Sequence, residues 1–210
     1  MAQLRIPLDS TRFSKGMTWK EYMAQMGDTR ERTEGNYNKA TLTDEERKFF
    51  SGVTDVKYIL MLAENWCGDV HRNSPLIAHI CDAIPGCELR VFFRDKETDL
   101  RVFFRDQNLD LTDCFLNNGY RSIPVVVFFD KDWNEIGRWI ERSHPATNKA
   151  ALIRSKTIEV APKDDKAKQD AAMNEFRAQV NAEYAVPGAP LWRAAVTEIK
   201  TLFDTRLAKK

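Results

Sequence analysis

Hydrophobic runs and helical stripes alternate along the middle of the chain. Segments with the continuous or alternating hydrophobic pattern of strands lie at 56–63, 89–93, 125–129 and 135–140. Between the first three strands, hydrophobic residues at helical spacing predict helices over 70–84 and 109–116. Turn residues at 130–134 predict that the last two strands pair antiparallel as a hairpin. The pattern therefore predicts the element order βαβαββ.

The segment before this region is predicted to be partly helical. Large apolar residues at spacings of three and four predict a short amphipathic helix over 17–26, and a polar, irregular stretch follows at 27–40. Thr43 and Glu46 have capping-box spacing, so a second helix is expected to start there and to end near Gly52.

Beyond Pro145 the chain is predicted to be helical, with two apolar stripes separated by a break at 187–190. The first stripe consists of Met173, Phe176, Val180 and Tyr184, and the second of Trp192, Val196, Ile199, Leu202, Phe203 and Leu207. Stripes of this kind are typical of helices that pack on a core, so we assign them no catalytic role.

The length of 210 residues and the hydrophobic share of 43% are enough for one core with appendages, rather than for several independent domains. We therefore expect an N-terminal helical extension over 1–52, an α/β core over 53–145, and a C-terminal helical tail packed on the core over 146–210.

One stretch of the predicted core is a tandem duplication. The segments 90–100 and 101–111 both begin RVFFRD, and eight of their eleven positions are identical. The sheet has one place for this strand, so one copy must lie elsewhere. The short connection at 85–88 favours the first copy as the strand. The second copy is then expected to lengthen the following helix, unless the two copies compete for the place.

Composition excludes several classes of partner. The 32 basic and 31 acidic residues leave a net charge of +1, which gives no basic surface for nucleic acid. The longest apolar runs, Tyr58–Ala63 and Val125–Phe129, are far shorter than the roughly 20 residues of a membrane span. The four cysteines lack the dense spacing of a disulfide scaffold. We expect a soluble, cytoplasmic protein without a membrane partner, and the sequence leaves its oligomeric state open.

The strongest chemical signal is Trp66-Cys67-Gly68-Asp69-Val70, placed between an apolar strand and a helix. A thiol at a helix N-terminus faces unpaired backbone N–H groups and the positive end of the helix dipole, so its pKa is expected to be lowered. The resulting thiolate is a nucleophile. The alternative is a thiol that has lost its activity at a site kept for its shape.

A second signal is Ile123-Pro124, which comes directly before the strand 125–129. Proline interrupts strand pairing and exposes the preceding backbone to an extended ligand, and an X-Pro bond in this place is suited to the cis form.

Together these residues resemble the thioredoxin superfamily, whose βαβαββ core places a W-C-x-x-C motif at the start of its first core helix and a cis-proline loop opposite it. The resemblance covers Val56 to Arg142 and is closest to bacterial thioredoxin-like proteins with a W-C-G-D-C motif and helical extensions. It implies a thioredoxin-like α/β fold, with a mixed sheet flanked by helices.

The resemblance also implies roles for individual residues. Cys67 corresponds to the attacking cysteine, and Pro124 corresponds to the cis-proline. The residues expected to bind substrate are Trp66, Gly68, Asp69, Ile123 and Pro124.

Two departures from the family pattern change the expected chemistry. Val70 stands where the family has its second, resolving cysteine, so Cys67 cannot close the usual intramolecular disulfide. Met61 stands six residues before Cys67, where many thioredoxins bury an acid that transfers protons to the resolving thiol. Ordinary dithiol activity is therefore not expected.

No other cysteine has the motif of a resolving thiol. Cys81 lies fourteen residues from Cys67 in the same predicted helix, which corresponds to about 21 Å, and Cys87 is placed farther away still. Cys114, in the next helix, stays open as a resolving thiol but has no supporting motif. Packing is the expected role of all three.

The histidines and the remaining motifs suggest no cofactor. His71 could contact the Cys67 thiolate in its charged form, or it could be a solvated surface residue. His79 and His144 have no partner that the sequence identifies. No zinc-site spacing and no glycine-rich phosphate loop is present, so neither a metal nor a nucleotide cofactor is expected.

Three functions follow from these residues. The leading hypothesis is monothiol exchange, in which Cys67 attacks a client disulfide or a glutathione adduct and an external thiol resolves the product. The alternative is a redox-inactive module that binds a peptide or protein beside Trp66, Ile123 and Pro124. A third possibility is that Val70 is a local change in a lineage whose interface still supports dithiol exchange.

Overall fold

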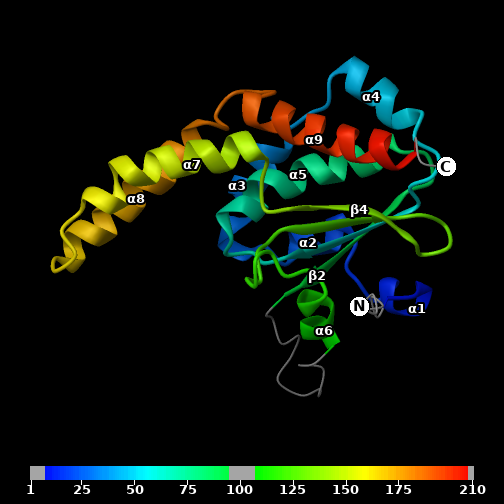
Figure 1. The fold of residues 1–210 in the computed structure, drawn as a ribbon, viewed down its shortest axis with the longest axis horizontal. Helices are drawn as coiled ribbons and strands as arrows, with labels where there is room; N and C mark the ends of the chain where they lie inside the picture. Colours follow the sequence, from blue (N-terminus) through cyan, green and yellow to red (C-terminus); the bar gives the residue numbers. More distant parts are fainter. Residues whose placement is uncertain (1–7, 95–106, 208–210) are drawn as a thin grey trace.

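A four-stranded mixed sheet lies at the centre of the structure, a computed structural model that describes residues 8–94 and 107–207 (Figure 1). Its strands are β1 Tyr58–Ala63, β2 Glu88–Phe93, β3 Val125–Phe129 and β4 Glu135–Ile140. In the order β2-β1-β3-β4, β1 is parallel to β2 and antiparallel to β3, and β3 is antiparallel to β4. The predicted mixed α/β fold and its hairpin are confirmed.

Helices cover both sides of the sheet, and further helices form the N-terminal and C-terminal extensions. In chain order they are α1 Ser10–Phe13, α2 Trp19–Ala24, α3 Arg30–Tyr37, α4 Asp44–Ser51, α5 Gly68–Ala83, α6 Gln107–Asp113, α7 His144–Lys156, α8 Lys166–Ala182 and α9 Pro190–Leu207. Short 3-10 turns lie at Gly27–Thr29 and Ile158–Val160. α5 and α9 lie on one side of the sheet and α6 on the other (Figure 1).

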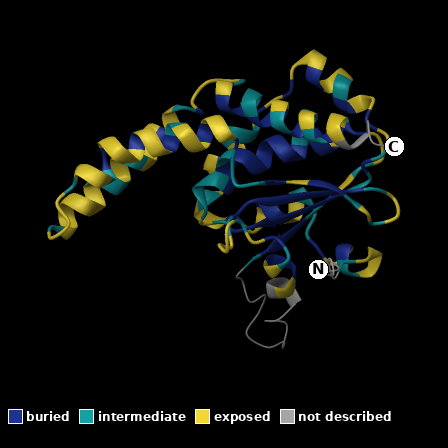
Figure 2. Cartoon of the chain, in the orientation of Figure 1, coloured by how far each residue is buried: buried dark blue, intermediate teal, exposed yellow. Residues whose placement is uncertain are grey.

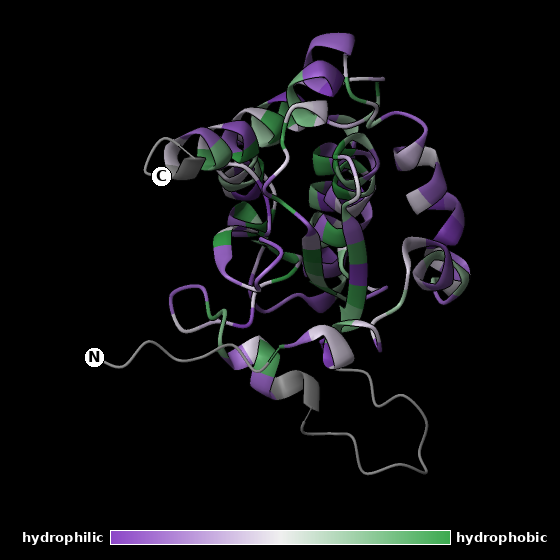
Figure 3. Ribbon diagram, turned by 90° about the vertical axis from the view of Figure 1, so that its right-hand side faces the viewer, coloured by the Kyte–Doolittle hydropathy of each residue, from purple (hydrophilic) through white to green (hydrophobic). Residues whose placement is uncertain are grey.

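The core lies where these helices meet the sheet. All residues of β3 are buried, as are all residues of β1 after Tyr58, which is typical of central strands covered on both faces. Figure 2 shows the same burial continuing into α5. In the turned view of Figure 3, hydrophobic positions gather in the central part of the ribbon, while the outer helices carry more hydrophilic ones.

The two C-terminal stripes pack in partly different places, because Tyr184 of the first stripe lies in the main core whereas Phe176 and Val180 do not. The second stripe packs in the main core as predicted, with Trp192, Val196, Ile199 and Phe203 buried. In α8, however, Val180 and Phe176 pack against Ala150 and Ile153 of α7, in a separate cluster. The α7–α8 pair projects away from the sheet (Figure 1). A neighbouring helix can bury an apolar stripe as well as a sheet can, so the stripe alone did not identify its partner.

The stretch 27–40 was predicted to be irregular, and this prediction is wrong because α3 occupies much of it. Only Thr33 of this helix is buried, so no apolar periodicity marks it. Polar and aromatic contacts hold it instead: Thr29 Oγ1 donates to the Asn65 carbonyl at 3.0 Å, and the Tyr37 ring stacks on His79 at 4.0 Å.

Pro75 lies inside α5 and determines how the extensions attach to it. Because proline has no N–H, it cannot bond the His71 carbonyl one turn earlier. Asn36 Nδ2 of α3 donates to that carbonyl at 2.8 Å. Trp192 Nε1 of α9 donates to the next carbonyl, that of Arg72, also at 2.8 Å. Both extensions therefore bond to the same turn of α5.

Residues 90–93 of the first RVFFRD copy lie in β2, as predicted. β2 is an edge strand, and Met17 covers part of its edge by exchanging two backbone hydrogen bonds with Val91, at 2.9 and 2.8 Å. In the second copy, 101–106 lies outside the described residues, and 107–111 is part of α6.

The two copies give a matched stability test. Phe93 is 3% exposed and its ring lies 5.7 Å from that of Tyr22, so Phe93→Ala should lower the free energy of unfolding by about 3 to 5 kcal/mol. Phe104→Ala, at the corresponding position of the second copy, should lower the free energy of unfolding by less than Phe93→Ala does, because the first copy already fills the place in the sheet. Chemical denaturation measures both variants, and equal losses would contradict the assignment.

Candidate active site

Cys67 lies at the junction between β1 and α5. β1 ends at Ala63, the chain turns through Glu64 and Asn65, and Cys67 is the N-cap residue of α5 with extended backbone (φ −83°, ψ 123°). Its N–H donates to the Glu64 carbonyl at 3.3 Å, and its carbonyl accepts from the His71 N–H at 3.1 Å. The strand-to-helix turn therefore places the thiol at the helix N-terminus, as the motif predicts.

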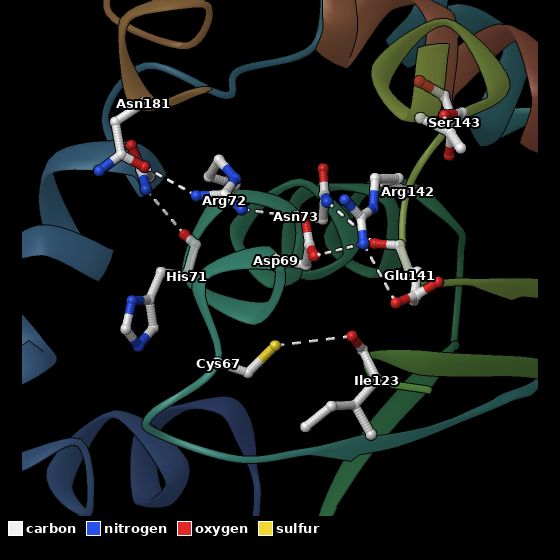
Figure 4. A network of polar contacts seen from close by, with 12 residues as sticks. Cys67, Asp69, His71, Arg72, Asn73, Ile123, Glu141, Arg142, Ser143 and Asn181 are labelled. Atoms are coloured by element: carbon white, nitrogen blue, oxygen red, sulfur yellow. Dashed lines mark hydrogen bonds and ion pairs between the residues drawn. The ribbon is translucent and has the colours of Figure 1, made fainter. Parts of the chain in front are cut away.

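The thiol faces the loop that leads into β3. Cys67 Sγ lies 3.6 Å from the carbonyl oxygen of Ile123 and points toward it (Figure 4). The peptide bond between Ile123 and Pro124 is cis. Both residues are buried, and the Pro124 carbonyl accepts from the Glu141 N–H at 2.7 Å. Two segments separated by 56 residues thus meet at the sulfur atom.

An open groove of about 730 Å³ lies over this meeting point. Trp66 and Tyr120 stand in its lining with 59% and 75% of their surfaces exposed. The Arg94 guanidinium lies 5.3 Å from the centre of the Trp66 ring. The remaining lining residues are Cys67, Asn117, Asn118, Arg121, Ser122, Ile123 and Glu141. The groove offers aromatic and cationic surface next to the thiol.

Three of the predicted site residues support the groove without lining it. Gly68 begins α5, where a Cβ would lie 3.1 Å from the Arg72 guanidinium, so packing favours glycine there. Pro124 is buried at the start of β3. The Asp69 side chain is 13% exposed and belongs to a polar network behind the thiol.

In this network Asp69 holds two arginines (Figure 4). Its carboxylate accepts from Arg72 and from Arg142, each at 3.0 Å. Arg72 also donates to Asn181 of α8 at 2.7 Å, and Arg142 donates to Glu141 at 3.1 Å. The network therefore joins the first turn of α5 to the end of β4 and to the C-terminal extension.

Burial dominates the acidity of the thiol. It raises the pKa of Cys67 above its ordinary value, and hydrogen bonds from the backbone of Val70 and Asp69 only partly oppose it. The Asp69 carboxylate also raises this pKa, whereas Arg72 lowers it. The expectation that the helix N-terminus leaves Cys67 with a lowered pKa is wrong in its net direction, because desolvation disfavours the thiolate more than the helix stabilises it.

His71 does not assist the thiolate. It is 2% exposed, its Nε2 lies 2.6 Å from the Asn65 carbonyl, and its ring points away from Cys67 (Figure 4). Burial lowers the pKa of His71, so the ring is neutral at pH 7. It is neither a charged partner of the sulfur nor a solvated surface residue, and both interpretations of the sequence are wrong.

The other histidines have partners that the sequence did not identify. His79 Nε2 lies 2.9 Å from the Tyr37 carbonyl, and His144 Nδ1 lies 3.0 Å from Glu198. In residues 8–94 and 107–207, no three His, Cys, Asp or Glu side chains are grouped so that they could hold a metal ion. Over the same residues, no helix has the length and apolar character needed to cross a membrane.

No second thiol lies in the motif. Val70, at the position of the missing cysteine, is fully buried, and Met61 is fully buried in β1. Cys81 and Cys87 lie at the far end of α5. Cys114 follows α6, and its Sγ donates to the carbonyl of Asp110 at 3.1 Å.

Sequence reasoning missed several residues of the site. Arg72 stands three residues after Asp69, and this helical spacing of opposite charges was a usable signal. Arg142, Tyr120 and Arg94 carried no such signal, since they reach the site from three separate segments that only the fold brings together.

The comparisons with known proteins agree with this architecture. Residues 16–101 and 97–156 match the family model described as thioredoxin, and the two matched segments overlap inside the duplicated stretch. No curated protein matches the chain.

Two solved structures are similar in fold. An HIV epitope-scaffold protein covers 94% of this chain and 99% of its own, with a TM-score of 0.59 and 17% identity. A protein of unknown function from Pseudomonas aeruginosa covers 81% of this chain and 92% of its own, with a TM-score of 0.52 and 18% identity. At these identities the similarity shows the fold alone.

The raised pKa predicts slow alkylation of Cys67. At pH 7 iodoacetamide should modify Cys67 more slowly than a free cysteine, and the rate should rise most steeply above pH 9.0, the ordinary value. Asp69→Asn should increase the rate at each pH, since it removes a negative charge while Arg72 stays. Peptide mass spectrometry across pH measures both rates. If the alkylation rate of Cys67 reaches half of its maximum below pH 7, burial does not dominate the pKa of this thiol.

Proposed function

Because this chain belongs to the thioredoxin family, we propose that it performs monothiol thiol–disulfide exchange at Cys67. The observation that supports this best is the position of the thiol: Cys67 Sγ lies 3.6 Å from the Ile123 carbonyl, in the lining of an open groove of about 730 Å³. A sulfur so placed can meet the disulfide of a ligand that lies along the Ile123 backbone.

The proposed reaction has two exchange steps. First, the Cys67 thiolate attacks one sulfur of a client disulfide or a glutathione adduct, and the other sulfur leaves as a thiolate that takes up a proton. Second, an external thiol such as glutathione attacks the mixed disulfide and releases Cys67. No net oxidation of the protein occurs, because each step exchanges one S–S bond for another.

The external thiol is required because Val70 and Met61 replace the groups that would resolve the intermediate within the chain. Both side chains are apolar and fully buried, so neither can attack the mixed disulfide or transfer a proton. The raised pKa limits the thiolate present at pH 7, but a thiolate of higher pKa is also the stronger nucleophile once formed. Exchange is therefore expected to accelerate as pH rises.

The groove supports binding of the substrate around the sulfur. The exposed rings of Trp66 and Tyr120 provide flat apolar surface, and Arg94 and Arg121 provide positive charge beside it. The Ile123 backbone is the proposed contact for an extended client strand, with Pro124, Gly68 and Asp69 supporting it from behind.

A second candidate is a redox-inactive binding module that uses the same groove. The raised pKa of Cys67 and the buried Val70 favour it, because together they reduce both the supply of thiolate and the means of completing a cycle. In this case the exposed rings of Trp66 and Tyr120 would bind a partner without turnover.

A glutathionylated peptide with excess reduced glutathione tests the proposal. The wild type should remove the adduct, should show a glutathione adduct at Cys67 by mass spectrometry, and should work faster at pH 9 than at pH 7. Cys67→Ser should reduce the rate to background, while Cys114→Ser, the matched control, should leave it unchanged. Removal at the wild-type rate by Cys67→Ser would sink monothiol exchange. If the wild type and Cys67→Ser bind the peptide with the same affinity and neither removes the adduct, the binding module is favoured.

A further inference from the structure

Cys81 and Cys87 lie close together at the end of α5 that is remote from the groove. Cys81 lies in the last turn of α5 and is 7% exposed, while the half-buried Cys87 comes directly before β2. The chain reverses between them through Pro85 and Gly86, and Gly86 has a φ of +68° that suits this tight turn. A helix end and a strand start are thus joined by a short turn with a cysteine on each side.

The two cysteines are in direct contact. Cys81 Sγ donates to the Cys87 carbonyl oxygen at 3.6 Å. The Cys87 side chain and burial both raise the pKa of Cys81, and the nearby Asp82 and Glu88 act in the same direction. The structure therefore holds two reduced thiols beside each other, with Cys81 kept protonated.

A pocket of about 240 Å³ opens onto this pair. Both cysteines line it, together with Trp19 of the N-terminal extension and Glu88 and Arg90 of β2. The pair is thus buried on the core side and open on the pocket side, so a small molecule can reach it.

Neither of the other cysteines competes for this pairing. Cys67 lies fourteen residues earlier than Cys81, about 21 Å along α5, against a limit of roughly 7 Å between the Cα atoms of a disulfide. Cys114 follows α6 and bonds to a carbonyl of that helix. All four cysteines of the chain lie in described residues, and among them Cys81 Sγ contacts another cysteine, at the Cys87 carbonyl.

We propose that Cys81 and Cys87 form a second dithiol site, which a small disulfide such as oxidised glutathione converts reversibly into an intramolecular disulfide. Cys87, the more exposed thiol, loses its proton to solvent and attacks one sulfur of oxidised glutathione, and one glutathione leaves as a thiol. Cys81 then attacks the Cys87 sulfur, and its proton passes to the second glutathione, which leaves as a thiol. The two cysteines lose two electrons in total, which the glutathione disulfide gains.

The closed bond would connect the end of α5 directly to the start of β2. Reduced glutathione in excess would reopen it by the reverse steps. The site is independent of the proposed exchange at Cys67, because no group of the groove takes part in either step.

The test uses the full chain carrying Cys67→Ser, so that failure of the proposed function at Cys67 does not affect it. The folded protein is equilibrated with mixtures of oxidised and reduced glutathione, alkylated and digested with trypsin, which leaves both cysteines in the peptide 73–90. We expect this peptide to become two hydrogens lighter and resistant to alkylation as the oxidised fraction rises. Excess reduced glutathione should reverse the change.

Two controls make the result specific. Cys81→Ser should accumulate a stable glutathione adduct at Cys87, since the second step is blocked, and Cys114→Ser should close like the parent. A stable adduct at Cys87 in the parent, or two alkylated thiols at every ratio, would overturn the proposal. So would equal closure in urea at the same ratio, because the folded structure would then contribute nothing to the pairing.

Discussion

The turn of α5 around Pro75 is the constraint on which the rest of the structure depends. Proline leaves the carbonyl of His71 without its helical partner, and the side chains of Asn36 and Trp192 bond this carbonyl and the next one. These two residues come from opposite ends of the chain. The extensions are therefore bonded to the helix that carries the candidate thiol, and Arg72, on the same turn, continues this connection to Asp69 and to α8. A buried polar network of this kind rigidifies the site that it surrounds.

The site combines a preserved geometry with altered chemistry. The thiol of Cys67 contacts the Ile123 carbonyl beneath a groove with exposed aromatic rings, which is the arrangement that the proposed exchange with an extended client needs. Val70 stands in place of a second nucleophile. The raised pKa of Cys67 lowers the fraction of this thiol that is present as thiolate. Exchange completed by an external thiol reconciles these features, since it needs one sulfur and an open groove. Burial raises the pKa of this thiol and the backbone hydrogen bonds at the helix N-terminus lower it, and here burial is the larger effect.

Much of the core could be predicted from the sequence, because hydrophobic pattern and strand-to-helix turns are local signals. The four strands, the first RVFFRD copy as β2, and the placement of Cys67 at the start of α5 all followed from such signals. α3 was missed because polar contacts rather than an apolar stripe hold it. The sign of the Cys67 pKa shift and the role of Arg142 depend on burial and on distant segments, which no local pattern contains. The contact between Cys81 and Cys87 was missed because both residues were considered only relative to Cys67, whereas the turn at Gly86 folds Cys87 back toward the end of α5.

Val70→Cys tests the central claim most directly, that this chain keeps an exchange-competent thiol and groove and lacks the resolving cysteine. The measurement is the reduction of a protein disulfide in the presence of a dithiol reductant, with Val70→Ser as the matched control. The account predicts that Val70→Cys forms a disulfide between Cys67 and the introduced cysteine and gains reduction activity above both the wild type and the control. Formation of that disulfide with no gain in activity would contradict the account, because it would show that the groove no longer presents clients to Cys67.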